Sequence, residues 1–556
     1  MMSRSHIRAF ACQPPALALG VLVIWLLLIG YAAAPTFAAY YPHADDWGLL
    51  AMSQPGLAQP LGWWTEGISR YFQLDGALNT SPYIRPLFNF GYWLTGLFAD
   101  WNSPARLWLT AVTVATAAAA MALALAAIQP RPSVAFAGGL LLPVLPGFLP
   151  ALVMLTPVAA FDPLCAGMAA LAFAAYVRRY YFWAAVALFA ALMTKESALP
   201  VALAFPLHYF WERRFAPVQE RPTALMPGLA LCLPLVIWFA LRLAFSQNPV
   251  VGDSLLGSDP RQILARLPQF ALKWPFGVGT PPWYLPPGLN AAFLLSCATL
   301  LANLAVVFGG AGLVLWRFWR ERRIGLAELC FFGAYAYLLL LGFAQRYGAV
   351  ISTFLLICLV HWSIRPETRR VGLALSLVAL GGVLAVAINA TANWQRVLPP
   401  VIDNYRTSAE YVRVLQQFGA DDTVLVLNDP STCYSHPQAL TRVAGITAQV
   451  HKLSDWVWNA PEGSAQCTVE LLAGAEPGRY EFRQRCGLEH CHSFAARDQP
   501  ATFVVPGIAS AELIPEPDAD GRALQWRRMQ VTVLREGVSL VYYDPAARRF
   551  QVQRVP

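Results

Sequence analysis

The amino-acid sequence predicts a polytopic α-helical membrane protein that ends in a globular domain outside the membrane. Three observations predict this fold class. Of the 556 residues, 57% are hydrophobic and 13% are charged, whereas about a quarter of the residues of a typical soluble domain are charged. Long apolar runs recur over residues 1–390, and the composition changes after them. A soluble core could not bury this much apolar surface, so we expect a bilayer to cover it.

A membrane-spanning helix needs about 20 mostly apolar residues. About eleven segments fit, although several are short or interrupted by proline. They are 16–38, 105–128, 134–153, 158–176, 180–193, 198–212, 224–246, 290–316, 326–344, 348–363 and 371–390. An alternative for the first is a cleaved signal peptide. Its apolar run is too long for one, so we expect a retained helix.

The net charge of +8 comes mostly from arginine, since Lys195, Lys273 and Lys452 are the only lysines. The arginines form short clusters between apolar runs instead of one basic face, which argues against nucleic-acid binding. The clusters are Arg4/Arg8, Arg131, Arg178/Arg179, Arg213/Arg214/Arg221, Arg317/Arg320/Arg322/Arg323 and Arg365/Arg369/Arg370. A cytoplasmic N-terminus puts every cluster in the cytoplasm, as the positive-inside rule requires. The segments 39–104, 247–289 and 391–556 then lie outside.

Residues 1–390 are therefore expected to form the membrane domain, and 391–556 an exported α/β or β-rich domain. In the tail, Tyr411, Val412, Leu415 and Phe418 share one helical face. Strand-like patterns and turn signals follow it. The strands are Thr423–Leu427, Met529–Arg535, Val538–Tyr543 and Phe550–Val555, and the turns are Glu536-Gly537 and Asp544–Ala547.

The ten cysteines divide by location. Cys12 lies near the cytoplasmic end, and five others lie in apolar spans and are expected to pack in the core: Cys165, Cys232, Cys297, Cys330 and Cys358. The exported tail holds Cys433, Cys467, Cys486 and Cys491, which suggests two disulfides with three connectivities open. A partial metal site at Cys486–His492 is an alternative, although its spacing departs from that of zinc sites.

Candidate catalytic groups lie in the first outer loop. Asp45 and Asp46 follow the first helix, and adjacent carboxylates repel, which can raise the pKa of one of them. Further along the same loop, Arg85 lies in Ser81–Leu87. Between them, the aromatic segment Gly62–Phe72 suits the membrane interface. Its tryptophans, Trp63 and Trp64, are read as interface aromatics, with a sugar-stacking platform as the alternative.

Further ionisable residues stand at the ends of later apolar runs. They are Asp162, the pair Lys195-Glu196, and Arg346, which precedes Tyr347. Ionisable groups at membrane depth are costly and are functional candidates by default. Nearly all of them fall on the outer side, so we expect them to meet the acidic pair in one cavity at the level of the external headgroups.

An acidic pair after the first helix, a YxRPL-like element at Tyr83–Leu87, a TKES-like turn at Thr194–Ser197 and a later Arg346-Tyr347 element resemble the GT-C glycosyltransferase superfamily. The nearest branch is that of protein O-mannosyltransferases, aminoarabinose transferases and TMTC-like proteins. The resemblance covers about residues 10–390. The tail matches no family that we can name.

The resemblance implies a glycosyltransferase of a bacterial-type inner membrane that takes a sugar from a polyprenyl-phosphate donor to an acceptor hydroxyl, with inversion. It implies Asp45 as the base and Asp46 as its partner, which orients the acceptor or holds a cation. Arg85, Lys195 and Arg346 would bind the donor phosphate, supported by Glu196, Tyr347 and Asp162. No metal is expected, and a divalent cation at the acidic pair is not favoured. The acceptor (a protein, a lipid or a glycan) and the sugar stay open.

Each candidate residue also has a simpler interpretation. Arg85 could anchor the loop to lipid phosphate, and Lys195 could pair only with Glu196. Asp162 is favoured as a helix N-cap, and Arg346-Tyr347 could be an interfacial anchor.

For the whole protein, the alternatives are a secondary transporter or flippase of lipid-linked or small substrates, a polymerase or ligase of surface glycans, and a structural membrane protein. Transporters usually show internal repeats and midplane charges, which this sequence lacks.

Overall fold

The protein is represented by a computed structural model, which describes the following parts of the chain: residues 4–42, 86–96, 98–129, 131–148, 151–152, 157–217, 219, 221–245, 291–341, 348–428, 443–453, 456–457, 468–485, 492–493, 501–517, 524–544 and 546–556. The chain divides into two compact units. The described residues of the first belong to Met1–Ala34, Asn79–Gly91 and Leu107–Gln395. Those of the second belong to Pro35–Leu78, Tyr92–Arg106 and Arg396–Pro556.

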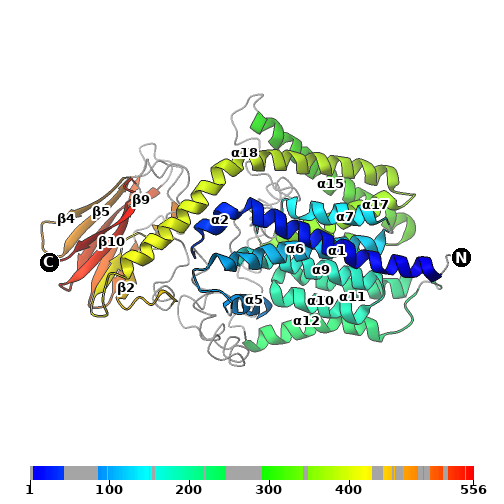
Figure 1. Cartoon of the computed structure of the whole chain (residues 1–556), viewed down its shortest axis with the longest axis horizontal. Helices are drawn as coiled ribbons and strands as arrows, with labels where there is room; N and C mark the ends of the chain where they lie inside the picture. The colour runs from blue at the N-terminus through cyan, green and yellow to red at the C-terminus, as the bar shows by residue number, and fades with distance from the viewer. Residues whose placement is uncertain are drawn as a thin grey trace. The chain divides into compact units, whose positions relative to one another are not determined.

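The first unit is built from helices, and every predicted span overlaps one of them. In chain order they are α1 (Arg4–Ala32), α6 (Trp108–Ile128), α7 (Pro132–Leu141), α9 (Phe161–Val177), α10 (Tyr181–Thr194), α11 (Leu199–Phe215), α12 (Met226–Phe245), α15 (Ala291–Glu321), α16 (Leu326–Leu341), α17 (Ala349–Ile364) and α18 (Arg369–Leu415). The short helices α2 (Ala34–Ala39) and α5 (Pro86–Gly96) lie in the chain between α1 and α6. In Figure 1, helices α6, α9, α10, α11 and α12 run side by side.

Among the described residues, four helices are long and apolar enough to cross a bilayer. They are Pro14–Ala32, Pro104–Ile128, Phe293–Glu321 and Arg369–Val386. Shorter apolar helices complete the bundle: α9 and α17 pack against α6, and α10 packs against α9 and α12. The chain is therefore a polytopic helical membrane protein with a sheet-containing C-terminal domain. The number of eleven spans stays a prediction.

Small side chains let these helices approach closely. A Cβ atom added to Gly167 of α9 would lie 3.0 Å from the Cα atom of Ala117 on α6. One added to Gly139 of α7 would lie 2.9 Å from the carbonyl oxygen of Ala118. Because lipid tails are as apolar as the side chains, close backbone contact is a main source of stability between membrane helices. The alanine-rich α6 therefore suits the centre of the bundle.

Helix α18 is 47 residues long and runs without a break past residue 390. The boundary between the two compact units falls inside it, at Gln395/Arg396. The apolar face predicted around Tyr411 forms the end of this helix, where Tyr411, Val412 and Leu415 are buried.

The described residues of the C-terminal domain form two larger sheets and a short two-stranded one. Figure 1 labels strands of both larger sheets. The four-stranded sheet has the order β11-β10-β1-β2 and consists of β1 (Thr423–Val426), β2 (Gln449–Lys452), β10 (Val538–Asp544) and β11 (Arg549–Arg554). The antiparallel five-stranded sheet has the order β4-β5-β9-β8-β7 and consists of β4 (Thr468–Ala473), β5 (Arg479–Arg485), β7 (Ala501–Val505), β8 (Ala509–Pro517) and β9 (Leu524–Val533). The two-stranded sheet pairs β3 (Trp456–Val457) with β6 (His492–Ser493).

The predicted strands of the tail are confirmed. Strands β1, β9, β10 and β11 overlap the four predicted segments. Gly537 has a φ of +75°, the left-handed conformation that the predicted Glu536-Gly537 turn needs. Strand β1 pairs in parallel with both β2 and β10. Side chains of both larger sheets, among them Leu540 and Phe482, share one buried core.

Candidate functional site

The chain reverses direction between α10 and α11, and this turn carries the candidate charges. Helix α10 ends at Thr194, and Lys195 is extended (φ −161°, ψ 145°) before a 3₁₀ turn at Glu196–Ala198. Helix α9, which packs against α10, begins at Phe161 and has Asp162 in its first turn. Antiparallel packing of the two helices therefore brings Asp162 and Lys195 to the same end.

Asp162 and Lys195 form a buried ion pair. The Nζ atom of Lys195 lies 2.5 Å from Oδ1 of Asp162. Each residue is 4% exposed, and the neighbouring Glu196 is 5% exposed. Moving charges out of water costs several kcal/mol per ion in proteins, and only close opposite charges and hydrogen bonds offset this cost. In the topology that the arginines predict, this pair lies at the outer end of the bundle.

The backbone of Lys195 is held on both sides. Its N–H donates to the carbonyl oxygen of Ala191 at 3.0 Å. The thiol of Cys165, one helical turn after Asp162, donates to the carbonyl oxygen of Lys195 at 4.0 Å and lies 3.6 Å from the hydroxyl of Ser197. The buried Cys165 agrees with the core role predicted for it. These contacts direct the lysine side chain toward Asp162.

The prediction that Asp162 caps helix α9 is wrong. The helix is preceded by a 3₁₀ turn at Pro157–Ala160, and the N-cap position is occupied by Ala160 without a side-chain hydrogen bond. The carboxylate of Asp162 pairs with Lys195, and at the first turn it also faces the positive end of the helix dipole. Lys195 thus has a partner on another helix. The simpler interpretation from the sequence, in which Lys195 pairs only with Glu196, did not foresee this partner.

The remaining predicted site residues lie outside the described residues. They are Asp45, Asp46, Arg85, Arg346 and Tyr347. The same holds for the outer loop 247–289, for Trp63 and Trp64, and for the tail cysteines Cys433, Cys467, Cys486 and Cys491. The shared cavity, the roles of these residues and the disulfides therefore stay predictions.

A close backbone contact lies beside one of these segments. A Cβ atom on Gly147, in the turn after α7, would lie 2.3 Å from the carbonyl carbon and oxygen of Gly348. The N–H of Gly147 also donates to the hydroxyl of Ser352 on α17 at 3.3 Å. Gly348 follows Arg346-Tyr347 directly in the chain. This contact therefore holds the start of α17 against the turn after α7.

We expect Gly147→Ala to destabilise the membrane unit by about 1–3 kcal/mol, because the added methyl group overlaps the backbone of Gly348. The measurement is the midpoint of thermal unfolding of the purified protein in detergent. Gly312→Ala on α15 is the matched control, since a Cβ atom there meets nothing within 4 Å. Equal midpoints for the two variants would contradict the role given to the Gly147–Gly348 contact.

Two aromatic pairs of the second unit involve residues of the predicted outer segment 39–104. The rings of Tyr41 and Trp101 lie edge to face at 5.6 Å, and those of Tyr40 and Tyr405 do so at 5.5 Å. Burial raises the pKa of Tyr41 from the usual 10 to about 12, so its hydroxyl, which is neutral at physiological pH in either case, stays protonated to a more alkaline pH. Tyr41 therefore adds no charge to the chain just before the acidic pair.

Sequence reasoning missed the buried Arg106, which organises the chain between α5 and α6. Its guanidinium donates to the carbonyl oxygens of Asp100 and Ala99 at 2.9 and 3.1 Å, and to the hydroxyl of Thr95 at 3.3 Å. Arg106 is 2% exposed. A signal was present, because an arginine at the outer end of a span departs from the positive-inside rule.

Sequence reasoning also missed a buried charge network at the predicted cytoplasmic end. Arg317 on α15 pairs with Glu328 on α16, and Trp362 on α17 donates to the same carboxylate at 2.8 Å. The N–H of Gly325 donates to its other oxygen at 2.6 Å. The isolated Glu328 within an apolar run was the available signal. The network ties three helices together.

The expectation that the protein holds no metal also stays a prediction. Among the described residues, no group of three or more His, Cys, Asp or Glu side chains is arranged to hold a metal ion. The acidic pair and the tail cysteines lie outside those residues.

Comparisons with known proteins identify similar solved structures. No protein-family model and no curated protein matches this sequence. A crystal structure of ArnT from Cupriavidus metallidurans in the apo state is similar with a TM-score of 0.40 and 12% identity, over 77% of this chain and 86% of that one. A crystal structure of the same protein bound to undecaprenyl phosphate is similar with a TM-score of 0.39 and 13% identity, over 81% of this chain and 86% of that one.

Proposed function

We propose that this protein is a GT-C type glycosyltransferase that moves a sugar from a polyprenyl-phosphate donor to an acceptor hydroxyl at the outer face of the membrane. The observation that carries the proposal is the buried Asp162–Lys195 ion pair at one end of a membrane helix bundle. A buried charge pair is weak evidence for stability, because its desolvation cost can exceed its attraction. Ionisable groups at membrane depth are functional candidates, and Lys195 of this pair lies in the TKES-like turn on which the family resemblance partly rests.

Lys195 suits the binding of a phosphate at this position. A lysine ammonium carries three N–H donors, so it can contact a carboxylate and a phosphate oxygen at once. Asp162 keeps the ammonium oriented, and the held backbone of Lys195 limits the directions that its side chain can take. Such a fixed cation stabilises charge on a leaving phosphate without having to reorganise during the reaction. Arg85 and Arg346 are proposed to contribute bidentate contacts to the same phosphate.

Asp45 is proposed as the general base. The acceptor oxygen attacks the anomeric carbon of the donor sugar while its proton passes to the carboxylate of Asp45. The bond between the anomeric carbon and the phosphate oxygen breaks, and its electron pair leaves with the polyprenyl phosphate. Attack from the face opposite the phosphate inverts the anomeric carbon. Asp46 would orient the acceptor.

The test is a donor panel. The purified protein, reconstituted in liposomes, is incubated with radiolabelled polyprenyl-phosphate sugars and a membrane extract as the source of acceptor. The panel includes sugars on undecaprenyl phosphate, the carrier named with the second ArnT structure. We expect label from at least one donor to move to an acceptor only when the wild-type protein is present. If every donor stays intact while the liposomes translocate it, the protein is a transporter and the proposal is wrong.

A further inference from the structure

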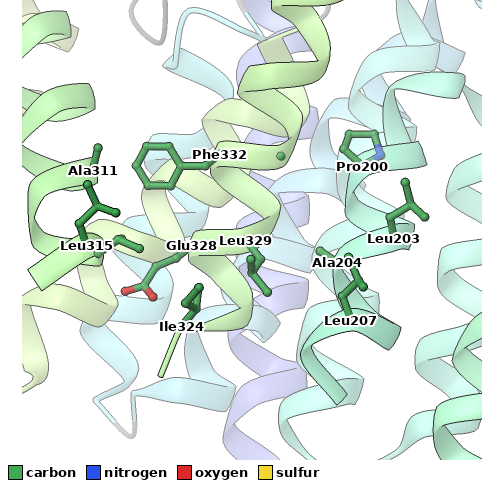
Figure 2. A pocket seen from close by; sticks show the side chains of 12 residues that line it. Pro200, Leu203, Ala204, Leu207, Ala311, Leu315, Ile324, Glu328, Leu329 and Phe332 are labelled. Carbon is green, nitrogen blue, oxygen red and sulfur yellow. The ribbon is translucent and has the colours of Figure 1, made fainter. Parts of the chain in front are cut away.

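A groove of about 480 Å³ lies between α11, α15 and α16 in the first unit. Figure 2 shows its two walls, with Leu203 and Leu207 of α11 on one side and Ala311 and Leu315 of α15 on the other. Phe332 of α16 lies between them. Neither Asp162 nor Lys195 lines the groove. It is therefore a feature that the proposed transfer reaction does not use.

The lining of the groove is apolar and faces outward. Leu203, Leu207 and Leu315 are 42%, 63% and 66% exposed. In a helix bundle that crosses a bilayer, exposed leucines of this kind face the hydrocarbon of the lipids. A water-soluble ligand would find few polar partners there. An apolar chain that enters sideways from the bilayer fits this lining.

Glu328 lines the groove as well, but it brings no uncompensated charge to it. Its carboxylate accepts hydrogen bonds from Arg317, from the indole of Trp362 and from the backbone N–H of Gly325. A carboxylate with three donors, one of them charged, is largely neutralised. An acyl chain beside it therefore meets no unpaired anion.

Basic side chains surround the predicted cytoplasmic end of the same three helices. Arg320 and Arg322 at the end of α15 are exposed, and so is Arg214 at the end of α11. Trp211 of α11 donates to the carbonyl oxygen of Arg322 at 3.1 Å, which joins the two helix ends.

Two of the acids at this end lie close to nitrogen atoms of basic side chains. Glu321 lies 3.9 Å from the guanidinium of Arg317, which is charged, and Glu212 lies 3.7 Å from Nδ1 of His208, an imidazole that is charged only when it is protonated. The surplus of positive charge at the membrane surface complements a phosphate.

We propose that the groove holds one acyl chain of an anionic phospholipid from the cytoplasmic leaflet, with its headgroup phosphate on Arg320 and Arg322. The apolar walls select a lipid tail, and the arginines at the helix ends select a net negative headgroup over a zwitterionic one. The site is independent of the proposed transfer, which takes place at the opposite end of the bundle in the predicted topology.

The experiment measures lipid binding by native mass spectrometry of the full-length protein after delipidation. The probes are phosphatidylglycerol and phosphatidylcholine with identical acyl chains. We expect the first phosphatidylglycerol to bind at least tenfold more tightly than phosphatidylcholine. Ala311→Phe, which fills the groove, should remove this tight site, whereas Ala298→Phe, at an exposed position of α15 outside the groove, should retain it.

Substitutions at exposed arginines test the proposal independently, in case Ala311→Phe prevents correct folding. Arg320→Gln with Arg322→Gln should reduce the preference for phosphatidylglycerol to near unity. Arg178→Gln, which removes an exposed arginine from another cytoplasmic loop, should leave the preference intact. Equal binding of both lipids to the wild type, or unchanged preference in the double arginine variant, would overturn the proposal. Neither outcome bears on the donor panel, because no sugar donor is present.

Discussion

Lys195→Met is expected to destabilise the membrane unit by about 3–5 kcal/mol, which is the usual cost of removing one partner from a buried ion pair. The variant leaves the carboxylate of Asp162, which is 4% exposed, without its ammonium. An uncompensated carboxylate in an apolar bundle must take up a proton or draw in water, and both are costly. The measurement is the midpoint of thermal unfolding in detergent, compared with that of the wild type.

The double variant Asp162→Asn with Lys195→Met separates a structural role from a functional one. It removes both charges and should regain most of the lost stability, because neutral groups of similar size carry no comparable desolvation cost. Transfer should stay at least about a hundredfold below the wild-type rate, since the phosphate loses a fixed cation. A double variant that is stable and transfers at the normal rate would show that the pair serves the fold alone.

Asp45→Asn is expected to lower the rate of sugar transfer by about 10²–10⁴-fold, the usual contribution of a general base. The amide has nearly the shape of the carboxylate but cannot accept the proton of the acceptor hydroxyl. The expression level and the affinity for the donor should stay close to those of the wild type, because the donor phosphate is held by cations. Initial rates and donor binding are measured on the same purified preparation.

Asp46→Asn is the matched control for this prediction. Asp46 is also an aspartate and lies in the same loop, but its proposed role is to orient the acceptor, whereas Asp45 is proposed to take up the proton. Its loss should therefore raise the KM for the acceptor more than it lowers kcat. If Asp46→Asn abolishes transfer while Asp45→Asn leaves the rate unchanged, the two roles are exchanged.

Local patterns predicted the membrane helices and several strands of the tail. Among the described residues, apolar runs located the helices α6, α7, α9, α10, α11, α12, α15, α16 and α17, because a helix that crosses a bilayer requires a run of apolar residues that is visible in the sequence. Alternation and turn residues located β10 and β11, and Gly537 has the positive φ that its turn requires. Among the described strands, β2 to β8 were missed. Burial on one face is a weaker signal in short strands with many charged residues, such as Arg479–Arg485 of β5.

For the candidate site, the sequence could single out residues but not their partners. Asp162 and Lys195 were recognised because isolated charges stand out in apolar runs. Their pairing could not be deduced, since 33 residues separate them and helix packing decides which ends meet. For the same reason, the sequence was also compatible with Asp162 as a helix cap and with a local pair between Lys195 and Glu196.

The sequence by itself determined that this chain crosses a membrane, which loops carry the positive charge and which residues are candidates for chemistry. These properties depend on composition and on periodicity over a few helical turns, so neighbours in the chain suffice to reveal them. The tertiary structure alone decided that Asp162 holds Lys195, that Gly147 packs on Gly348 and that β1 lies between β10 and β2. Each of these contacts joins segments distant in the chain, and close packing between helices or strands, which no local pattern encodes, selects it.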